Sequence, residues 1–241
     1  MYAGVDPNSY FHPKPWWTIK LFTEKSGMDN SPLKKIVSDI LDNRFFQRKL
    51  CFMSIDVETG EVIIFDESID ELSHEERINA LISSTSIPGA FAPERIDGRS
   101  LADGSLHTTV AIGEPINRCR DEGYKDEDII IDILMCYTGV YDVESWDLEG
   151  TRWYNALDFY RRRKSITHYY FYKEDMVRMF RGYKDIDFRL TIMPRTPLTA
   201  GAIPLSATAD DVAREYVQGY EDGLAATDEY LARTNSTTTT N

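Results

Sequence analysis

Apolar residues recur at helical spacing in the segment that follows Ser31 and Pro32. Serine favours the position just before a helix and proline favours the first helical position. The apolar residues between positions 33 and 41 then fall on one side of a helix. This pattern predicts an amphipathic helix from about residue 31 to about residue 41.

Two capping-box patterns predict the starts of two further helices. Ser73 with Glu76 precedes an apolar pattern that ends near Ser84, and Thr208 with Asp211 precedes a longer one. The longer pattern predicts a final amphipathic helix. Its apolar side holds Val212, Tyr216, Val217, Tyr220, Leu224 and Leu231.

Four runs rich in β-branched and aromatic residues have the pattern of strands. The runs at 50–56 and 61–67 flank a turn that contains Gly60, which predicts a hairpin or two neighbouring strands. Residues 129–135 are almost continuously apolar, the pattern of a strand covered on both faces, as in a parallel sheet between helices. Residues 186–193 predict a further strand.

The remaining pattern predicts helices between these strands. A helix is expected near Pro115, with Gly123 as its stop, and the aromatic and basic region 152–183 is expected to be helical with a break near Ser165. Alternation of helices and strands favours the α/β class. We expect an irregular lead-in at 1–30, one domain at 31–233 and a disordered tail at 234–241.

Composition narrows the class of protein. The chain has 241 residues, 42% of them hydrophobic, which suits a folded domain with a real core. Its net charge of −13 argues against general attraction to nucleic acid or to anionic membranes. Neither a leader sequence nor an apolar run long enough to span a membrane is evident, so we expect a cytoplasmic or peripheral membrane location.

The standard ligand-binding patterns are absent from the sequence. It contains no GxGxxG, GxxxxGK[ST] or HExxH, and its three cysteines and four histidines show no ligand spacing. We therefore predict no cofactor and no metal. The basic run 161–164, beside Tyr160 and Tyr169, could contact a phospholipid head group. Most charge runs, however, form a solvated helix face.

Residues 86–105, SIPGAFAPERIDGRSLADGS, contain two Asp-Gly pairs. Asp-Gly is a common turn pair, because aspartate bonds its own backbone and glycine accepts positive φ. Asp97-Gly98 is most simply a connection between strands. Asp103-Gly104, taken alone, is also a turn.

The surroundings of Asp103 resemble the patatin-like phospholipase family, a family of lipid acyl hydrolases. The resemblance covers about residues 31–231 and is carried by PLKKIVSDIL, CFMSIDVETGEVIIFDE, the segment ISSTSIPGAFAPERIDGRSLADGS, INRCRDEGYKDEDIIIDILM and ADDVAREYVQGYEDGL. It implies a three-layer α/β/α sandwich and a Ser-Asp dyad. Asp103 would be the proton acceptor of that dyad, in a motif with Gly104. Ser105 departs from the family pattern, which has glycine or alanine there.

The resemblance leaves the dyad incomplete. The chain contains no GxSxG elbow to supply the nucleophile and no Gly-rich loop to supply oxyanion donors. Because loss of the nucleophile alone lowers the rate of a serine hydrolase by about 10⁶-fold, we expect this chain by itself to be inactive. The N-terminal strand, elbow and helix of the family fold would be missing.

Three hypotheses follow. In the first, the chain is a lipid acyl hydrolase whose N-terminal part is absent through truncation or an incomplete gene model. Its substrates would then be phospholipid or neutral-lipid acyl esters at a membrane surface. Alternatively, it is a non-catalytic interaction or scaffold protein, with a protein partner that covers the exposed sheet. In the third, it is an unrelated α/β domain whose Asp-Gly turns are structural.

Overall fold

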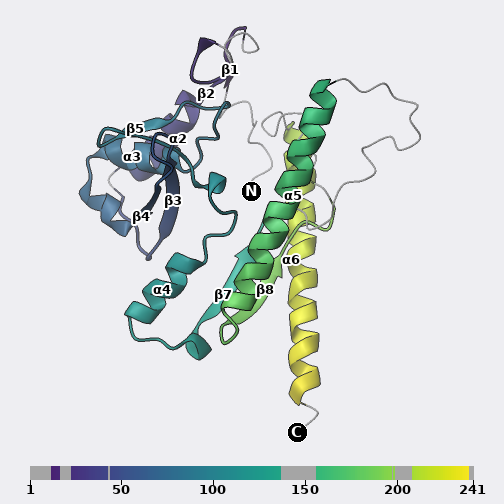
Figure 1. The fold of residues 1–241 in the computed structure, drawn as a ribbon. Helices are drawn as coiled ribbons and strands as arrows, with labels where there is room; N and C mark the ends of the chain where they lie inside the picture. The colour runs from purple at the N-terminus through teal and green to yellow at the C-terminus, as the bar shows by residue number, and fades with distance from the viewer. Residues whose placement is uncertain are drawn as a thin grey trace, which may run out of the picture. The chain divides into compact units, whose positions relative to one another are not determined.

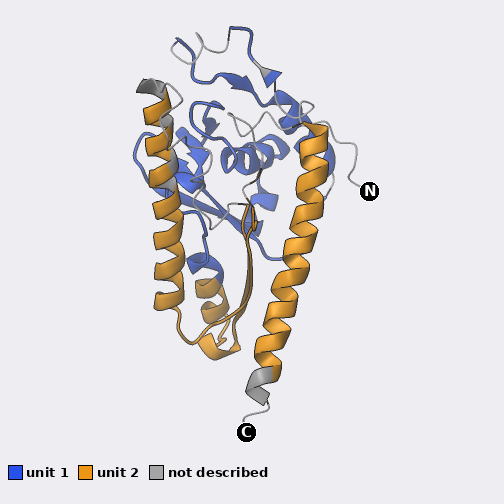
Figure 2. Ribbon diagram, turned by 90° about the vertical axis from the view of Figure 1, so that its right-hand side faces the viewer, with its two compact units in different colours: residues 1–115 blue, residues 116–241 orange. Residues whose placement is uncertain are grey.

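The computed structural model describes residues 12–16, 23–42, 44–136, 156–196, 198 and 208–238. The chain divides into two compact units, Met1–Pro115 and Ile116–Asn241 (Figure 2). The first contains a four-stranded sheet and the second a two-stranded parallel sheet. The expected α/β class is confirmed in this general form.

The main sheet of the first unit is antiparallel throughout. Its strands are β3 (Cys51–Asp56), β4 (Val62–Asp66), β5 (Glu94–Ile96) and β6 (Arg99–Asp103), in the order β4-β3-β6-β5 (Figure 1). The predicted β3–β4 hairpin is confirmed, and Gly60 in its turn has φ +76°. Asp97 (φ 48°) and Gly98 (φ 77°) connect β5 to β6, as predicted. Two consecutive positive φ values suit a two-residue hairpin turn.

Helices α2 (Ser31–Leu41) and α3 (His74–Ser83) are where the apolar pattern predicts them. The predicted cap of α2 is displaced by one residue. Asn30 is the N-cap, and the Asp29 carboxylate accepts the Ser31 N–H at 3.0 Å. The α3 capping box forms as predicted: Glu76 accepts the Ser73 N–H at 3.1 Å, and the Ser73 hydroxyl accepts the Glu76 N–H at 3.3 Å.

Two apolar clusters hold the first unit together. One cluster joins α3 to the sheet, and the other joins α3 to α2. Their buried members are Ile69, Ala80, Ile96 and Leu101 in the first, and Leu41, Ile78 and Ile82 in the second. The core of this unit therefore lies around α3.

Shorter elements complete the description. They are β1 (His12–Pro13) paired with β2 (Met28–Asp29), the 3₁₀ turns η2 (Glu67–Glu71), η3 (Gly104–Leu106) and η4 (Asp126–Asp128), and helix α4 (Gly113–Asp121). The helix predicted near Pro115 is thus confirmed. Gly123, with φ +93°, follows its end.

The second unit contains a β-α-β crossover. Strand β7 (Ile130–Leu134) runs parallel to β8 (Asp187–Ile192), and α5 (Ala156–Gly182) lies between them in sequence. In Figure 2, α5 and α6 (Ala209–Thr238) lie on opposite sides of the strand pair. The parallel pairing is the arrangement that the sequence predicts.

Two expectations about the second unit are wrong. Ile130 is 55% exposed and Leu134 is 76% exposed, so β7 is not covered on both faces. The described sheet here has only two strands, and α6 packs against β8. Helix α5 continues through Ser165 without the predicted break; serine, unlike proline, leaves the backbone hydrogen-bonding pattern intact.

The C-terminal helix is longer than the sequence predicts. It continues to Thr238, into the segment 234–241 for which we predict disorder. The length of a helix does not make it a membrane span. Among the described helices, none combines the length and the apolar content that crossing a bilayer requires.

The Asp211 carboxyl group of the α6 capping box is expected to titrate at low pH. The Thr208 hydroxyl and N–H, followed by Arg214, lower the pKa of Asp211 from 3.8 to about 2. Because the pKa of Asp211 is lowered in the folded chain, the ionised carboxylate stabilises the helix fully above about pH 4. This stabilisation is lost as the pH falls towards 2. A carboxyl-carbon NMR titration should therefore give a midpoint near 2 for Asp211.

Two variants check the cause of this titration. Thr208→Ala should raise the Asp211 midpoint towards 3.8, because it removes the hydroxyl that bonds the carboxylate at 2.7 Å. Thr227→Ala, which removes a hydroxyl elsewhere on α6, should leave it unchanged. A midpoint in Thr208→Ala equal to that of the unmodified chain would contradict this account.

Candidate functional site

Asp103, the residue that the resemblance assigns as a proton acceptor, is the last residue of β6. Its N–H donates to the carbonyl of Ser86 at 3.1 Å, and across the sheet it pairs with Ser54 of β3. This pairing fixes the backbone at the point where β6 turns into η3. Asp103 is therefore held at a defined place, half-buried at the end of a strand.

The carboxylate of Asp103 caps its own turn. One oxygen accepts the Ser105 N–H at 2.8 Å, the bond of an N-cap aspartate. Among the described residues, no serine hydroxyl donates to this carboxylate. A general base needs the proton that it abstracts within about 2.6–3.2 Å. The geometry shown is that of a structural turn, and a nucleophile would have to approach from elsewhere.

Three fully buried serines surround the backbone of Asp103. The hydroxyls of Ser54 and Ser83 are 2.7 Å apart, and Ser83 also donates to the Ala80 carbonyl at 2.7 Å. Ser86 donates to the Ile82 carbonyl at 2.8 Å. Because each hydroxyl is bonded and none is exposed, none of the three is placed to attack a substrate. The Ser-rich segment after α3 instead caps the end of that helix.

Gly104 is the residue that the tight turn needs. A Cβ at this position would lie 2.4 Å from Met53 Cγ, 2.6 Å from Met53 O and 2.9 Å from Met53 C. Two of these atoms belong to the backbone of β3, the strand between β4 and β6. Glycine is therefore required by close approach of two backbones, with no reference to catalysis.

Ser105, the departure from the family motif, is exposed. Its hydroxyl is on the same turn as the Asp103 carboxylate, so only its N–H meets that group. His107 is also exposed, at the end of η3. The turn thus brings together a carboxylate, a glycine and an exposed hydroxyl, without the elbow that a dyad requires.

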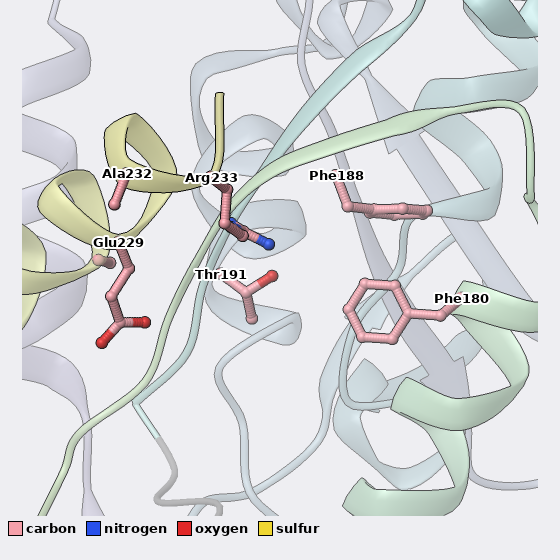
Figure 3. Close-up of a pocket in the computed structure, with 7 residues that line it drawn as sticks. Phe180, Phe188, Thr191, Glu229, Ala232 and Arg233 are labelled. Carbon is pink, nitrogen blue, oxygen red and sulfur yellow. The ribbon is translucent and has the colours of Figure 1, made fainter. Parts of the chain in front are cut away.

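A pocket of about 490 Å³ lies in the second unit, between α5, β8 and α6 (Figure 3). Phe180 and Phe188 form one wall, with ring centroids 4.9 Å apart in an edge-to-face arrangement. Thr191 and Arg233 also line the pocket. The other lining residues are Ala226, Glu229 and Ala232.

This pocket includes none of the site residues predicted from the sequence. Its walls combine an aromatic pair with one guanidinium, and Glu229 is engaged by Arg195 at 3.1 Å. These lining side chains are suited to contact with an apolar group. They include no nucleophile beside a base. Three segments distant in sequence form it, so no local motif signals its presence.

The remaining candidates from the sequence do not form a cluster. In the basic run, Arg163 and Lys164 are exposed and Arg162 is half-buried, whereas the side chain of Arg161 is outside the described residues. His74 bonds the Ser38 hydroxyl at 2.9 Å on the surface. Within the described ranges, no three histidine, cysteine or acidic residues lie together as metal ligands would.

Comparison with known families gives no assignment. No protein-family model matches this chain. The Asp103 turn therefore stands on its own geometry, and any function drawn from it is a proposal.

Proposed function

We propose that the chain is a patatin-like domain that holds the aspartate half of a Ser-Asp dyad and hydrolyses no lipid ester by itself. The observation that carries this proposal is the Asp103 carboxylate, formed on a rigid turn and bonded only to the Ser105 N–H among the described residues. Hydrolysis of phospholipid or neutral-lipid acyl esters would begin when another segment brings a serine nucleophile and oxyanion donors to this carboxylate.

In a Ser-Asp dyad, the serine attacks the ester and the aspartate accepts the proton of the serine hydroxyl. The carboxylate must be fixed so that an incoming hydroxyl finds it in hydrogen-bonding range. Strand pairing with Ser54 and the bond to Ser105 fix Asp103 without any nucleophile. In the proposed dyad, Asp103 would therefore be held in place before the nucleophile arrives.

Labelling of the full chain with a fluorophosphonate tests the absence of a reactive serine. We expect no labelling, and no hydrolysis of phospholipid vesicles above the uncatalysed rate. Ser54, Ser83 and Ser86 are buried and bonded, and the exposed Ser105 meets the Asp103 carboxylate through its N–H. An active serine hydrolase in the same tube is the positive control. Stoichiometric labelling of any serine would overturn the proposal.

Two substitutions separate the turn role of Asp103 from a catalytic one. Asp103→Ala should lower the free energy of unfolding by about 1 kcal/mol, as loss of an N-cap does, whereas Asp103→Asn keeps an acceptor and most of the stability. Neither should change ester hydrolysis by the chain alone. A fall in hydrolysis in Asp103→Asn, with stability retained, would make Asp103 a working base here.

A second candidate, a non-catalytic interaction domain, is favoured by the exposed apolar residues of the second unit. The transcript upstream of the Met1 codon distinguishes the two. An in-frame Gly-rich loop and GxSxG favour the hydrolase, and an in-frame stop codon favours the interaction domain.

A further inference from the structure

Helix α6 packs against β8 through its polar side. Asp222 is only 7% exposed, and its carboxylate accepts the Arg195 N–H at 3.2 Å. The Gln218 amide donates to the Thr196 carbonyl at 3.0 Å, and Arg195 pairs with Glu229 at 3.1 Å. These bonds, made just beyond the end of β8, fix the rotation of α6 about its axis.

The apolar side of α6 consequently faces away from the unit to which the helix belongs. We call it the α6 stripe; its members are Val212, Tyr216, Val217, Tyr220, Leu224 and Leu231. Tyr216 and Tyr220 are 63% and 65% exposed, and Leu224 is 52% exposed. An amphipathic helix normally buries such a side. A contiguous exposed apolar patch of this kind marks an interaction surface.

We propose that a second copy of this chain covers the α6 stripe, with the two α6 helices antiparallel across a two-fold axis near Glu221. The charges along one edge of the stripe favour this arrangement. At helical spacing, that edge carries Asp210, Arg214, Glu221 and Asp228. The choice of partner rests on this charge pattern and is independent of the proposed lipid chemistry.

The antiparallel arrangement forms two pairs of opposite charge, one on each side of an axis at which Glu221 meets its own counterpart. Arg214 and Asp228 are equally far from Glu221 in sequence, so Arg214 of each copy faces Asp228 of the other. In a parallel pair, this edge of one helix would face the other edge of its partner, so Arg214 and Asp228 would not meet. A two-fold contact is self-complementary, so both ion pairs form at once.

Two glycines occupy matching positions about the same axis. Gly219 and Gly223 lie two residues on either side of Glu221 in sequence and at the other edge of the stripe. A Cβ built on Gly219 would meet nothing within 4 Å, whereas one built on Gly223 would lie 4.0 Å from Ile192 Cδ1 of β8. Glycine inside a helix costs about 1 kcal/mol relative to alanine. No contact within its own unit requires Gly219, so this edge of α6 is open to the approach of a partner helix.

The area of the stripe suits a weak dimer. Half-exposed tyrosine, leucine and valine side chains on α6 offer on the order of 600 Å² per copy, given about 150–250 Å² for a fully buried aromatic side chain. A standard interface buries about 800 Å² per partner. With the flanking polar residues included, we expect reversible dimers with a Kd in the micromolar range.

Sedimentation equilibrium of the full chain over a range of concentrations tests the proposal. We expect a monomer–dimer equilibrium that Tyr220→Glu weakens at least 30-fold, because it places a charge in the stripe. Tyr170→Glu is the matched control, since Tyr170 is a similarly exposed aromatic residue on α5 (57%), and it should leave the equilibrium unchanged. A chain that stays monomeric overturns the proposal, including the case in which another segment or a different protein covers the stripe.

Charge reversal tests the antiparallel register. Arg214→Glu and Asp228→Arg should each weaken dimers about five-fold, and the double variant should restore them. Because Arg214 also pairs with Asp211 in its own chain, rescue by the double variant is the informative result. Dimers insensitive to all three variants would exclude this register.

Cross-linking gives an independent measurement of orientation. Under oxidising conditions, Glu221→Cys should form a disulfide-linked dimer well above the background from the three native cysteines. Arg214→Cys should not, because in an antiparallel pair its counterpart lies about 21 Å away along the helix axis at 1.5 Å per residue. Equal cross-linking of both variants would exclude this antiparallel register and overturn the proposal.

Discussion

Gly104→Ala is expected to lower the free energy of unfolding of the first unit by about 3 kcal/mol, at the upper end of the usual cost of overpacking. The added Cβ would lie 2.6 Å from the carbonyl oxygen of Met53 and 2.9 Å from its carbonyl carbon. These backbone atoms lie in β3, which is hydrogen-bonded to strands on both sides, so they do not move aside easily. Urea unfolding followed by circular dichroism measures the change.

Gly98→Ala is the matched control for this substitution. Gly98 lies in the preceding turn, with φ +77° and no atom within 4 Å of an added Cβ. Its replacement should therefore cost only the strain of a positive φ, about 1 kcal/mol. If Gly98→Ala were as destabilising as Gly104→Ala, the contact with Met53 would not be the cause.

Arg77→Met is expected to destabilise the first unit by a similar amount, about 3 kcal/mol, the lower end of the range for breaking a buried ion pair. The Arg77 side chain is 7% exposed, lies 3.4 Å from the Asp70 carboxylate and donates to the Arg44 carbonyl at 2.7 Å. Asp70 in turn accepts the Phe46 N–H at 2.8 Å. The pair therefore joins η2, α3 and residues 44–46.

A double-mutant cycle shows whether the pair itself is responsible. Asp70→Ala combined with Arg77→Met should cost less than the two single changes added together, because the double variant leaves no buried charge unpaired. Glu61→Gln is the surface control: Glu61 pairs with Arg99 at 2.7 Å, but both side chains are largely exposed. Its effect should stay within about 0.5 kcal/mol. Additivity in the cycle would argue against coupling between Asp70 and Arg77.

Local signals in the sequence predict most elements correctly. The Ser73-Glu76 and Thr208-Asp211 boxes form, and Asp97-Gly98 connects two antiparallel strands. Each of these features is decided within a few residues by capping bonds or by the φ values that a turn needs. The absence of a break at Ser165 shows where local signals fail, because a polar residue alone does not end a helix.

The candidate site is predicted only in part. The sequence indicates a turn at Asp103 and Gly104, and the structure has it there. It does not indicate that Ser54 and Ser83 bond each other beside that turn, because that contact joins β3 to the end of α3. The pocket at Phe180 and Phe188 likewise depends on three segments that meet only after folding.

The sequence by itself determined the local elements of this protein: its helix starts, its hairpin turns and the amphipathic character of α6. Only the tertiary structure decided which side of each element is covered. The apolar stripe of α6 is exposed because Asp222 and Gln218 bond the backbone beyond β8 and fix the rotation of the helix. Likewise, replacement of Gly104 is costly because an added Cβ would lie 2.6 Å from the carbonyl oxygen of Met53. Periodicity specifies that a helix has an apolar side, but only long-range contacts specify where that side points.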